Sequence, residues 1–174
     1  ALAAPAEFVL SENCPPGFEL SSGQCKLRSM YQMYDSLQDA GVGGLKTGLP
    51  SYRDGFSPQQ IDLGRYLFFD PVLSGDGTVS CASCHNPALG FSDGRGRSVG
   101  INGQTVNRSA QSLWNVAFGQ RFFWDARAAT LEEQMRGPLS DVREMTNNPP
   151  QLLRTLNDLP LYRALFRQAW PEDF

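Results

Sequence analysis

Five consecutive residues, Cys81-Ala82-Ser83-Cys84-His85, combine two thiols and one imidazole at a fixed spacing. This Cys-x-x-Cys-His order is the attachment signature of a c-type haem. The two thiols are spaced to form thioether bonds with the two vinyl groups of one porphyrin, and the imidazole that follows becomes an axial ligand of the iron. The sequence therefore predicts one covalently bound haem c, attached through Cys81 and Cys84 and ligated by His85.

Two other interpretations use the same side chains. A bare Cys-x-x-Cys is also found as a redox dithiol, and the four cysteines of the chain, with His85, supply enough donors for a zinc site. Zinc ribbons usually bring two close cysteine pairs, whereas Cys14 and Cys25 are eleven positions apart. The haem interpretation is therefore favoured.

His85 is the only histidine among the 174 residues. If it ligates the iron, the opposite face of the haem is open, water-bound, or held by a side chain other than histidine. Peroxidases keep this sixth position open, whereas electron carriers fill it. A monohaem electron-transfer cytochrome with a methionine ligand, drawn from Met30, Met33, Met135 or Met145, is thus the alternative to an enzyme. A subunit whose haem only passes electrons onward is a third class.

Composition and charge exclude several kinds of partner. The net charge is −3, with no basic stripe of the kind that a phosphate backbone requires, so nucleic acid is not expected as a partner. No window approaches the roughly twenty apolar residues of a membrane span. Residues 1–6 have neither a charged region nor an apolar run and are typical of an N-terminus left after signal-peptide removal, which predicts an exported, periplasmic protein.

The elements that must position the haem motif are predicted to be helices joined by long loops. Ser57-Pro58-Gln59-Gln60 is a capping-box helix start, and the apolar stripe that follows ends before Asp70. This helix is expected to lie against the haem. A short helix is predicted from Thr130 to Arg136, stopped by residues 137–138, and two more over 149–156 and about 159–170. The pattern favours a mainly α, cytochrome c-like haem domain with long irregular loops.

Residues 1–55 are dense in proline and glycine and are predicted to be a loop-rich N-terminal extension with one short helix around 27–37. Cys14 and Cys25 enclose a turn-rich segment that a disulfide would staple in an oxidising compartment; the alternative is two unpaired buried thiols. A c-type haem and a disulfide point to the same compartment. Residues 56–174 would form the haem domain.

Side chains beyond the pentapeptide also suggest haem contacts. Arg65, in the first predicted helix, is a candidate partner for a haem propionate, the alternative being a solvated arginine. Residues 86–112 are loop-like and would have to wrap a haem edge or another subunit. The aromatic cluster that follows is more often core than cofactor lining, so Trp114 is expected in the core.

An ordered set of motifs from residue 57 to the end resembles the first haem domain of the bacterial di-haem cytochrome c peroxidase and MauG family. The motifs are LGRYLFFDP at 63–71, LSGDGTVSCASCHNP at 73–87, FWDARA at 123–128, LEEQ at 131–134, GP at 137–138 and EM at 144–145. They extend over about two thirds of the chain and are far more specific together than the pentapeptide alone. The resemblance implies a haem oxidoreductase that reacts with hydrogen peroxide.

The resemblance also implies roles for single residues. Glu144 matches the distal carboxylate that takes a proton from hydrogen peroxide and returns it to the departing oxygen. Gln134 matches an amide of the distal pocket, and Pro138 a proline on the distal side of the peroxide-reactive haem. Trp124 matches the tryptophan between the two haems, which relays electrons.

The chain departs from the family pattern at several positions. It lacks the second histidine of members that rest in a bis-histidine state, so the site is expected to be open at rest. Ala126 stands where Trp-Asp-Gly-Arg usually has glycine, which requires a backbone conformation that a Cβ tolerates. Ser109 replaces the usual asparagine ligand of a calcium ion, and Asn107 lies two residues before it; these two are the candidate calcium ligands.

The family continues into a second haem domain with its own Cys-x-x-Cys-His, and these 174 residues contain one such motif. The expected partner is therefore a second haem-bearing chain or a C-terminal domain that is missing here. The electrons would come from a small redox protein or from side chains of a protein substrate.

Overall fold

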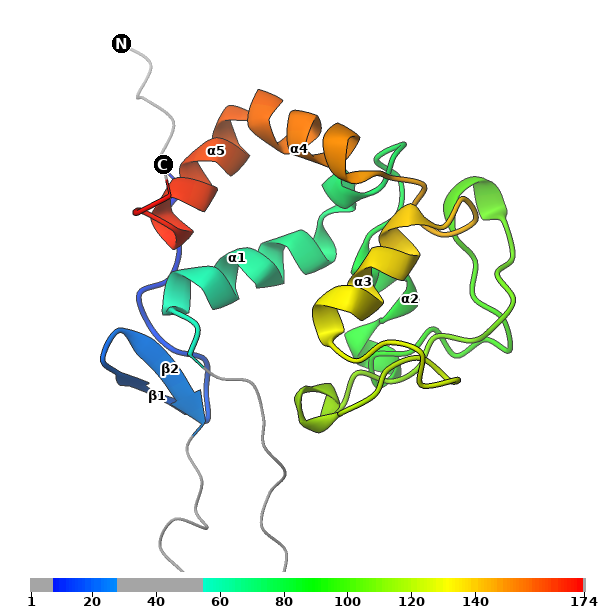
Figure 1. Ribbon diagram of the computed structural model, residues 1–174, viewed down its shortest axis with the longest axis horizontal. Helices are drawn as coiled ribbons and strands as arrows, with labels where there is room; N and C mark the ends of the chain where they lie inside the picture. Colours follow the sequence, from blue (N-terminus) through cyan, green and yellow to red (C-terminus); the bar gives the residue numbers. More distant parts are fainter. Residues whose placement is uncertain (1–7, 28–54, 174) are drawn as a thin grey trace, which may run out of the picture.

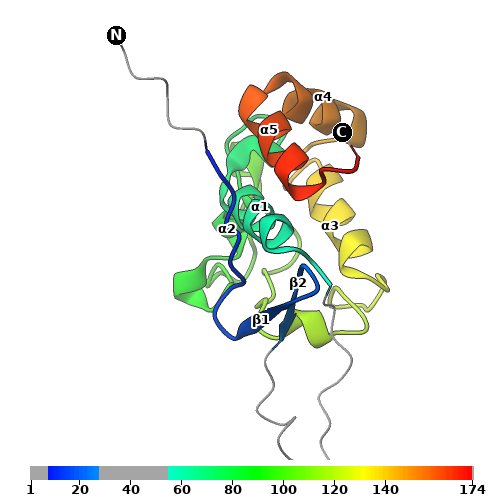
Figure 2. The same ribbon diagram turned by 90° about the vertical axis from the view of Figure 1, so that its left-hand side faces the viewer.

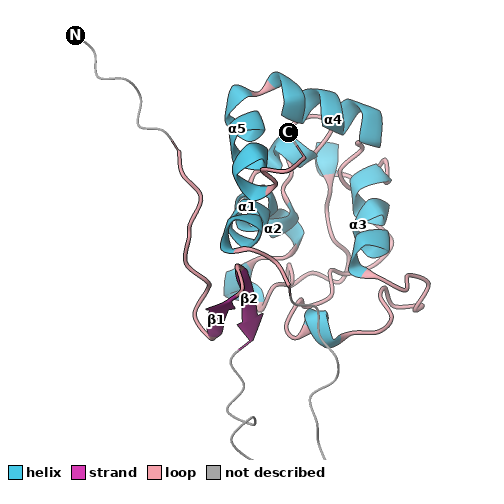
Figure 3. Ribbon diagram, turned by 60° about the vertical axis from the view of Figure 1, so that its left-hand side comes forward, coloured by secondary structure: helices cyan, strands magenta, loops and turns pink. Residues whose placement is uncertain are grey.

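The computed structural model describes residues 8–27 and 55–173, and most of the regular structure in this part of the chain is helix, with long loops between the helices (Figures 1 and 3). The strands and α-helices are β1 (Phe18–Ser21), β2 (Gln24–Leu27), α1 (Pro58–Phe69), α2 (Cys81–Cys84), α3 (Leu131–Ser140), α4 (Pro149–Asp158) and α5 (Pro160–Ala169). Short 3₁₀ turns interrupt the long loops at Pro71–Leu73, Pro87–Leu89, Ile101–Gly103 and Val116–Phe118. No helix within the described ranges is long and apolar enough to cross a membrane.

Helix α1 begins where the capping box predicts. The Ser57 hydroxyl accepts the Gln60 amide at 3.2 Å, and the Gln60 side chain accepts the Ser57 amide at 3.0 Å. Two of the orphan amides of the first turn are satisfied in this way. The helix ends at Asp70, whose carboxylate accepts the Val72 amide at 2.8 Å and so starts the next turn of chain toward the haem motif.

The main core lies between α1 and α5, which run beside each other in Figures 1 and 2. Its buried members are Leu10, Leu63, Tyr162, Leu165 and Ala169. Helix α5 therefore turns Tyr162 inward, whereas Leu161 is half exposed.

The buried Tyr162 hydroxyl has a specific partner. It donates to the Asp70 carboxylate at 2.6 Å, and burial, together with that carboxylate, raises the pKa of Tyr162 so that the donor proton stays in place. Tyr162→Phe is expected to lower the free energy of unfolding by about 1–2 kcal/mol, because Asp70 loses its donor. Urea unfolding of the haem-loaded protein measures this loss. An unchanged midpoint would show that water replaces the phenol at no cost.

The N-terminal segment is part of this core. Leu10 is buried in it, the Ser11 amide donates to the Asp62 carboxylate at 2.9 Å, and the Leu10 amide donates to Gln168 at 2.8 Å. The expected disulfide between Cys14 and Cys25 is present. Residues 8–27 thus pack on the helical domain through both apolar and polar contacts.

The loop-rich extension expected here also contains a feature that was not predicted, an antiparallel hairpin of β1 and β2. Its two-residue turn, Ser22-Gly23, has positive φ at both positions, 52° and 78°. Such turns match the right-handed twist of paired strands. The helix predicted around 27–37 falls almost wholly outside the described residues; Leu27 itself ends β2.

Helices α4 and α5 agree with the sequence pattern, but α3 is longer than predicted. The expectation that residues 137–138 stop it is wrong, since α3 runs through Pro138 to Ser140. Pro138 lies in the last turn, where the missing N–H removes only one helical hydrogen bond, the one to the Gln134 carbonyl. The Asp141 amide then donates to Gly137 at 2.9 Å and closes the helix.

Candidate haem site

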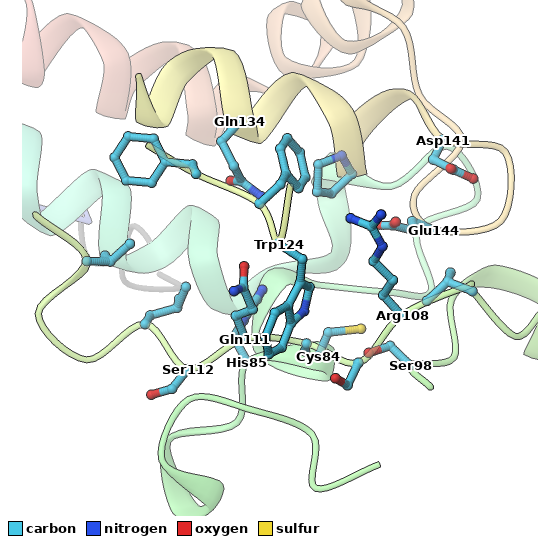
Figure 4. Close-up of a pocket in the computed structure, with 18 of the residues that line it drawn as sticks. Cys84, His85, Ser98, Arg108, Gln111, Ser112, Trp124, Gln134, Asp141 and Glu144 are labelled. Atoms are coloured by element: carbon cyan, nitrogen blue, oxygen red, sulfur yellow. The ribbon is translucent and has the colours of Figure 1, made fainter. Parts of the chain in front are cut away.

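A cavity of about 510 Å³ separates α2 from α3, and its size is in the range of ligand-binding sites. Cys84 and His85 line one side of it, and Gln134 of α3 lines the other (Figure 4); Pro138 of α3 also belongs to the lining. Glu144 belongs to the same lining, from the turn that follows α3. Residues that lie up to sixty positions apart in the sequence therefore share one space.

Helix α2 presents the two thiols three positions apart on a single turn, capped by Ser80. Cys84 lines the cavity, whereas Cys81 is half-buried outside the lining. Burial raises the pKa of both thiols, that of Cys84 to about 11. A redox dithiol needs a lowered thiol pKa, so these cysteines lack the environment of one.

A four-thiolate zinc site is excluded by the Cys14–Cys25 disulfide, which removes two of the four thiols. Within the described ranges, no group of three or more histidine, cysteine or acidic side chains is arranged to hold a metal ion. Cys81 and Cys84 are the free cysteines of the chain and adjoin the His85 imidazole, so they remain available for the predicted haem attachment.

The ring of His85 is oriented by the loop that follows it. Its Nδ1 lies 3.0 Å from the carbonyl oxygen of Phe91. A carbonyl only accepts, so Nδ1 carries the proton and Nε2 is left as the unprotonated nitrogen. This arrangement fixes the tautomer in which Nε2 is free to bind a metal, and metal-binding histidines commonly donate their other ring N–H to a backbone carbonyl in this way.

The polar lining of the cavity also suits a porphyrin with its carboxylates. Ser98 Oγ, in the lining, is fully buried and has no hydrogen-bond partner among the described residues. Buried hydroxyl groups almost always have a hydrogen-bond partner, so the unpaired Ser98 hydroxyl is available to bond to a group bound in the cavity. Four arginines line the cavity as well: Arg108, Arg121, Arg127 and Arg143.

Arg65 is not among these arginines. Its guanidinium pairs with Asp62 at 2.6 Å and lies over the Tyr66 ring at 4.5 Å, and its side chain is 56% exposed. Its position therefore does not support a propionate contact and agrees with the alternative of a solvent-facing arginine. No residue of α1 lines the cavity, so the expectation that α1 lies against the haem is not supported either.

Glu144 has the environment of an acid–base group. It is half-buried, and burial followed by the negative charge of Asp141 raises the pKa of its carboxyl. The positive charges of Arg143, which pairs with Asp141 at 3.0 Å, and of Arg127 oppose this shift but do not outweigh it. A raised pKa brings a carboxylate nearer to the pH at which it exchanges protons in catalysis.

Trp124 projects from a tight turn and is 64% exposed. Asp125 pins the turn by pairing with Arg127 at 2.8 Å and Arg108 at 3.2 Å. Ala126 has a φ of 58°, so its backbone is in the left-handed region. The expectation of a conformation that a Cβ tolerates is thus met only at a cost, because L-residues are disfavoured there.

Replacing Ala126 by glycine is expected to stabilise the protein by up to about 1 kcal/mol, since glycine has no penalty at positive φ and only its larger unfolded-state entropy opposes the gain. Ala129→Gly is the matched control: Ala129 has an ordinary φ, so this change should destabilise. Thermal unfolding of both variants distinguishes the two cases. A loss of stability in Ala126→Gly would contradict the assigned strain.

The structure places Trp114 and two of the methionines away from their candidate positions. Trp114 is 67% exposed, with its ring edge-on to Phe91 at 5.5 Å, so the prediction that it lies in the core is wrong. Met145 is 5% exposed and Met135 is 53% exposed, and neither lines the cavity.

The positions of the methionines show which of them could serve as the sixth ligand of a haem iron in the cavity. No methionine of the described ranges lines the cavity, and Met30 and Met33 lie outside those ranges.

Asn107 and Ser109, the candidate calcium ligands, do line the cavity. The lining arginines were missed by the sequence analysis, although Arg127 belongs to the FWDARA motif and Arg108 directly precedes Ser109.

A mainly helical chain that presents Cys-x-x-Cys-His beside a cavity defines the class of c-type haem proteins. The family model described as di-haem cytochrome c peroxidase matches residues 58–174. The chain therefore belongs to the di-haem cytochrome c peroxidase and MauG family.

Individual relatives agree with this assignment. Methylamine utilization protein MauG of Methylorubrum extorquens is 44% identical over 114 residues, which cover 66% of this chain and 32% of that protein. Cytochrome c551 peroxidase of Pseudomonas aeruginosa is 40% identical over 116 residues, covering 67% of this chain and 34% of that protein. A crystal structure of a MauG-like protein associated with microbial copper homeostasis superimposes with a TM-score of 0.62 at 33% identity, over 74% of this chain and 41% of that one. The chain spans about a third of the length of these curated relatives.

Proposed function

We propose that residues 56–174 form the peroxide-reacting, cytochrome c-like haem domain of a di-haem oxidoreductase. The observation that carries the proposal is that Glu144, a carboxylate with a raised pKa, shares one cavity with the oriented imidazole of His85, while no methionine of the described residues lines it. An open sixth position beside a proton-exchanging group is the arrangement of a haem peroxidase.

The residues of the chain have separate tasks in this proposal. Cys81 and Cys84 tether one haem c, and His85 ligates its iron through Nε2. A bound haem would supply the iron chemistry that cleaves the O–O bond of hydrogen peroxide. Glu144 would accept one proton of hydrogen peroxide and return it to the oxygen that departs as water. The Gln134 amide, in the same lining, orients the peroxide by hydrogen bonding.

The haem carboxylates would be held by the cavity arginines rather than by Arg65. Arg108 and Arg127 are already fixed in place by Asp125, so they offer oriented donors at little further entropy cost. Arginine and carboxylate groups form strong paired hydrogen bonds. Pro138, opposite α2, restricts the distal side because it has no N–H and a rigid ring.

Oxidising equivalents would leave the site through Trp124 toward a second haem. Trp124 both lines the cavity and is largely exposed, so a neighbouring domain or chain can contact it. The second haem would belong to a further domain or a partner chain, and a small redox protein or a protein substrate would donate the electrons. Asn107 and Ser109 are the residues to test for calcium. The Cys14–Cys25 disulfide favours a periplasmic location.

The test is the ferric absorption and EPR spectrum of the haem-loaded protein, with any co-purifying chain retained, before and after one equivalent of hydrogen peroxide. A high-spin haem that is converted by peroxide supports the proposal. A low-spin haem that does not react would make the protein an electron carrier. If Met145 were the sixth ligand of such a carrier, it would have to leave the buried site that it occupies.

A further inference from the structure

We infer that Gly100 is a positioning residue for Glu144: its missing side chain lets one loop pack directly on the backbone that carries the carboxylate. This inference rests on the proposed role of Glu144 in the peroxide reaction. Gly100 is 44 positions away in the sequence, and no motif connects the two residues.

The contact at Gly100 leaves no room for a side chain. A Cβ built on Gly100 would overlap the carbonyl oxygen of Arg143 and lie 2.6 Å from the Cα of Glu144. Gly100 has a φ of −99°, which any residue adopts, so the glycine is required for close approach and not for its conformation. The next amide, of Ile101, donates to the Glu144 carbonyl at 3.0 Å.

The other side of the same segment is held in a similar way. A Cβ on Gly75 would overlap the carbonyl oxygen of Thr146, and the Gly75 amide donates to the Met145 carbonyl at 2.7 Å. The Asn147 side chain donates to the Leu73 carbonyl at 2.8 Å. Gly75 lies six residues before Cys81, in the turn that leads into the haem-attachment helix.

Residues 143–146 are therefore clamped between the Gly75 turn and the Gly100 loop by backbone contacts from both sides. This clamp fixes where the Glu144 Cα lies relative to α2, and with it the distance from the carboxylate to a haem attached there. General acid–base groups act only within hydrogen-bond reach of the proton that they move. A displacement of about one ångström can cost 10²-fold in rate.

The experiment compares Gly100→Ala with Gly96→Ala in the haem-loaded protein. Gly96 is in the same loop region, has no atom within 4 Å of a built Cβ and has no positive φ, so its substitution is the matched control. Gly100→Ala is expected to slow the single-turnover reaction with hydrogen peroxide about 10- to 100-fold, with unchanged haem content and ferric spectrum. Gly96→Ala should react as the parent does.

Two further readouts separate positioning from general damage. The double variant Gly100→Ala/Glu144→Gln should be no slower than Glu144→Gln alone, because both changes remove the same proton transfer. The pH midpoint of the rate should also shift in Gly100→Ala, since the carboxyl has moved in its surroundings. If the double variant were slower by the product of the two single-variant factors, the two changes would act independently and the inference would be overturned.

Hydrogen exchange on the unchanged haem-loaded protein tests the clamp even if Gly100→Ala does not fold. The Ile101 and Gly75 amides should exchange much more slowly than exposed loop amides such as that of Gly96, because they donate to the Glu144 and Met145 carbonyls. Fast exchange at Ile101 would overturn the inference, as would a full rate in Gly100→Ala. A full rate in Glu144→Gln would instead remove the proposed role of Glu144.

Discussion

Replacing Glu144 by glutamine is expected to slow the reaction of the haem-loaded protein with hydrogen peroxide by about 100-fold or more, the usual loss when a general acid–base group is removed. Glutamine has nearly the same shape, so haem content and ferric spin state should be retained. Stopped-flow absorption at one equivalent of peroxide measures the rate. Glu172→Gln, at the exposed end of the chain, is the control and should react normally.

The rate of the peroxide reaction should also depend on pH in a defined direction. Glu144 must be ionised to accept the proton, so the rate of the parent protein should rise with pH through the pKa of this carboxyl. Burial raises that pKa, so the midpoint should lie above the ordinary value of 4.5. The Glu144→Gln variant should lack this rise. The same rise in the variant would assign the titration to another group.

The raised pKa of Glu144 also predicts how the Glu144→Gln change affects folding stability. A carboxyl whose pKa is raised in the folded state destabilises the fold as pH increases from its unfolded pKa to its folded pKa, and that loss persists at neutral pH. Glu144→Gln has no charge to bury, so at pH 7 it should be at least as stable as the parent. Slow peroxide turnover in a protein of undiminished stability would separate catalysis from folding.

Replacing either haem-attachment cysteine is expected to leave the chain largely unfolded. The main buried cluster has only five members between α1 and α5, and much of the loop region from residue 85 to 130 lines the cavity. A haem bound only by the native state stabilises that state. Without a thioether bond at Cys84, which lines the cavity, the loops around the cavity would lose the haem that they are expected to pack against.

Far-UV circular dichroism and covalent haem staining of Cys81→Ser and Cys84→Ser measure this effect, with helix content expected to fall strongly. Ala82→Ser retains the Cys-x-x-Cys-His order and is the control that should load haem and fold. Normal helix content in the two cysteine variants would show that the polypeptide packs without its cofactor.

Much of the local structure followed from residues close together in the sequence. The Ser57 capping box, the start of α4 after Asn148 and the haem pentapeptide all depend on interactions within a few positions, so the pattern of residue types was sufficient. The Cys14–Cys25 disulfide was likewise expected from a turn-rich segment. The end of α3 was wrong because a proline in a last turn costs only one hydrogen bond.

The family motifs identified some residues of the cavity, whereas others could be placed there only by the tertiary structure. The ordered motifs identified Glu144, Gln134 and Trp124 as candidates, and all three line one cavity. No local pattern distinguished Arg65 from the arginines that face the cavity, because which side of a fold an arginine reaches depends on how loops cross in space. Trp114 was misplaced for the same reason.

The sequence by itself therefore determined the cofactor chemistry, the family and most helix starts of this protein, since these depend on covalent spacing and short-range hydrogen bonds. Only the tertiary structure decided that Leu10 completes the core and that Gly100 packs on the backbone of Glu144. Both contacts join segments that are far apart in the chain. Their energies come from apolar burial and from close backbone approach, and neither leaves a periodic signal in the sequence.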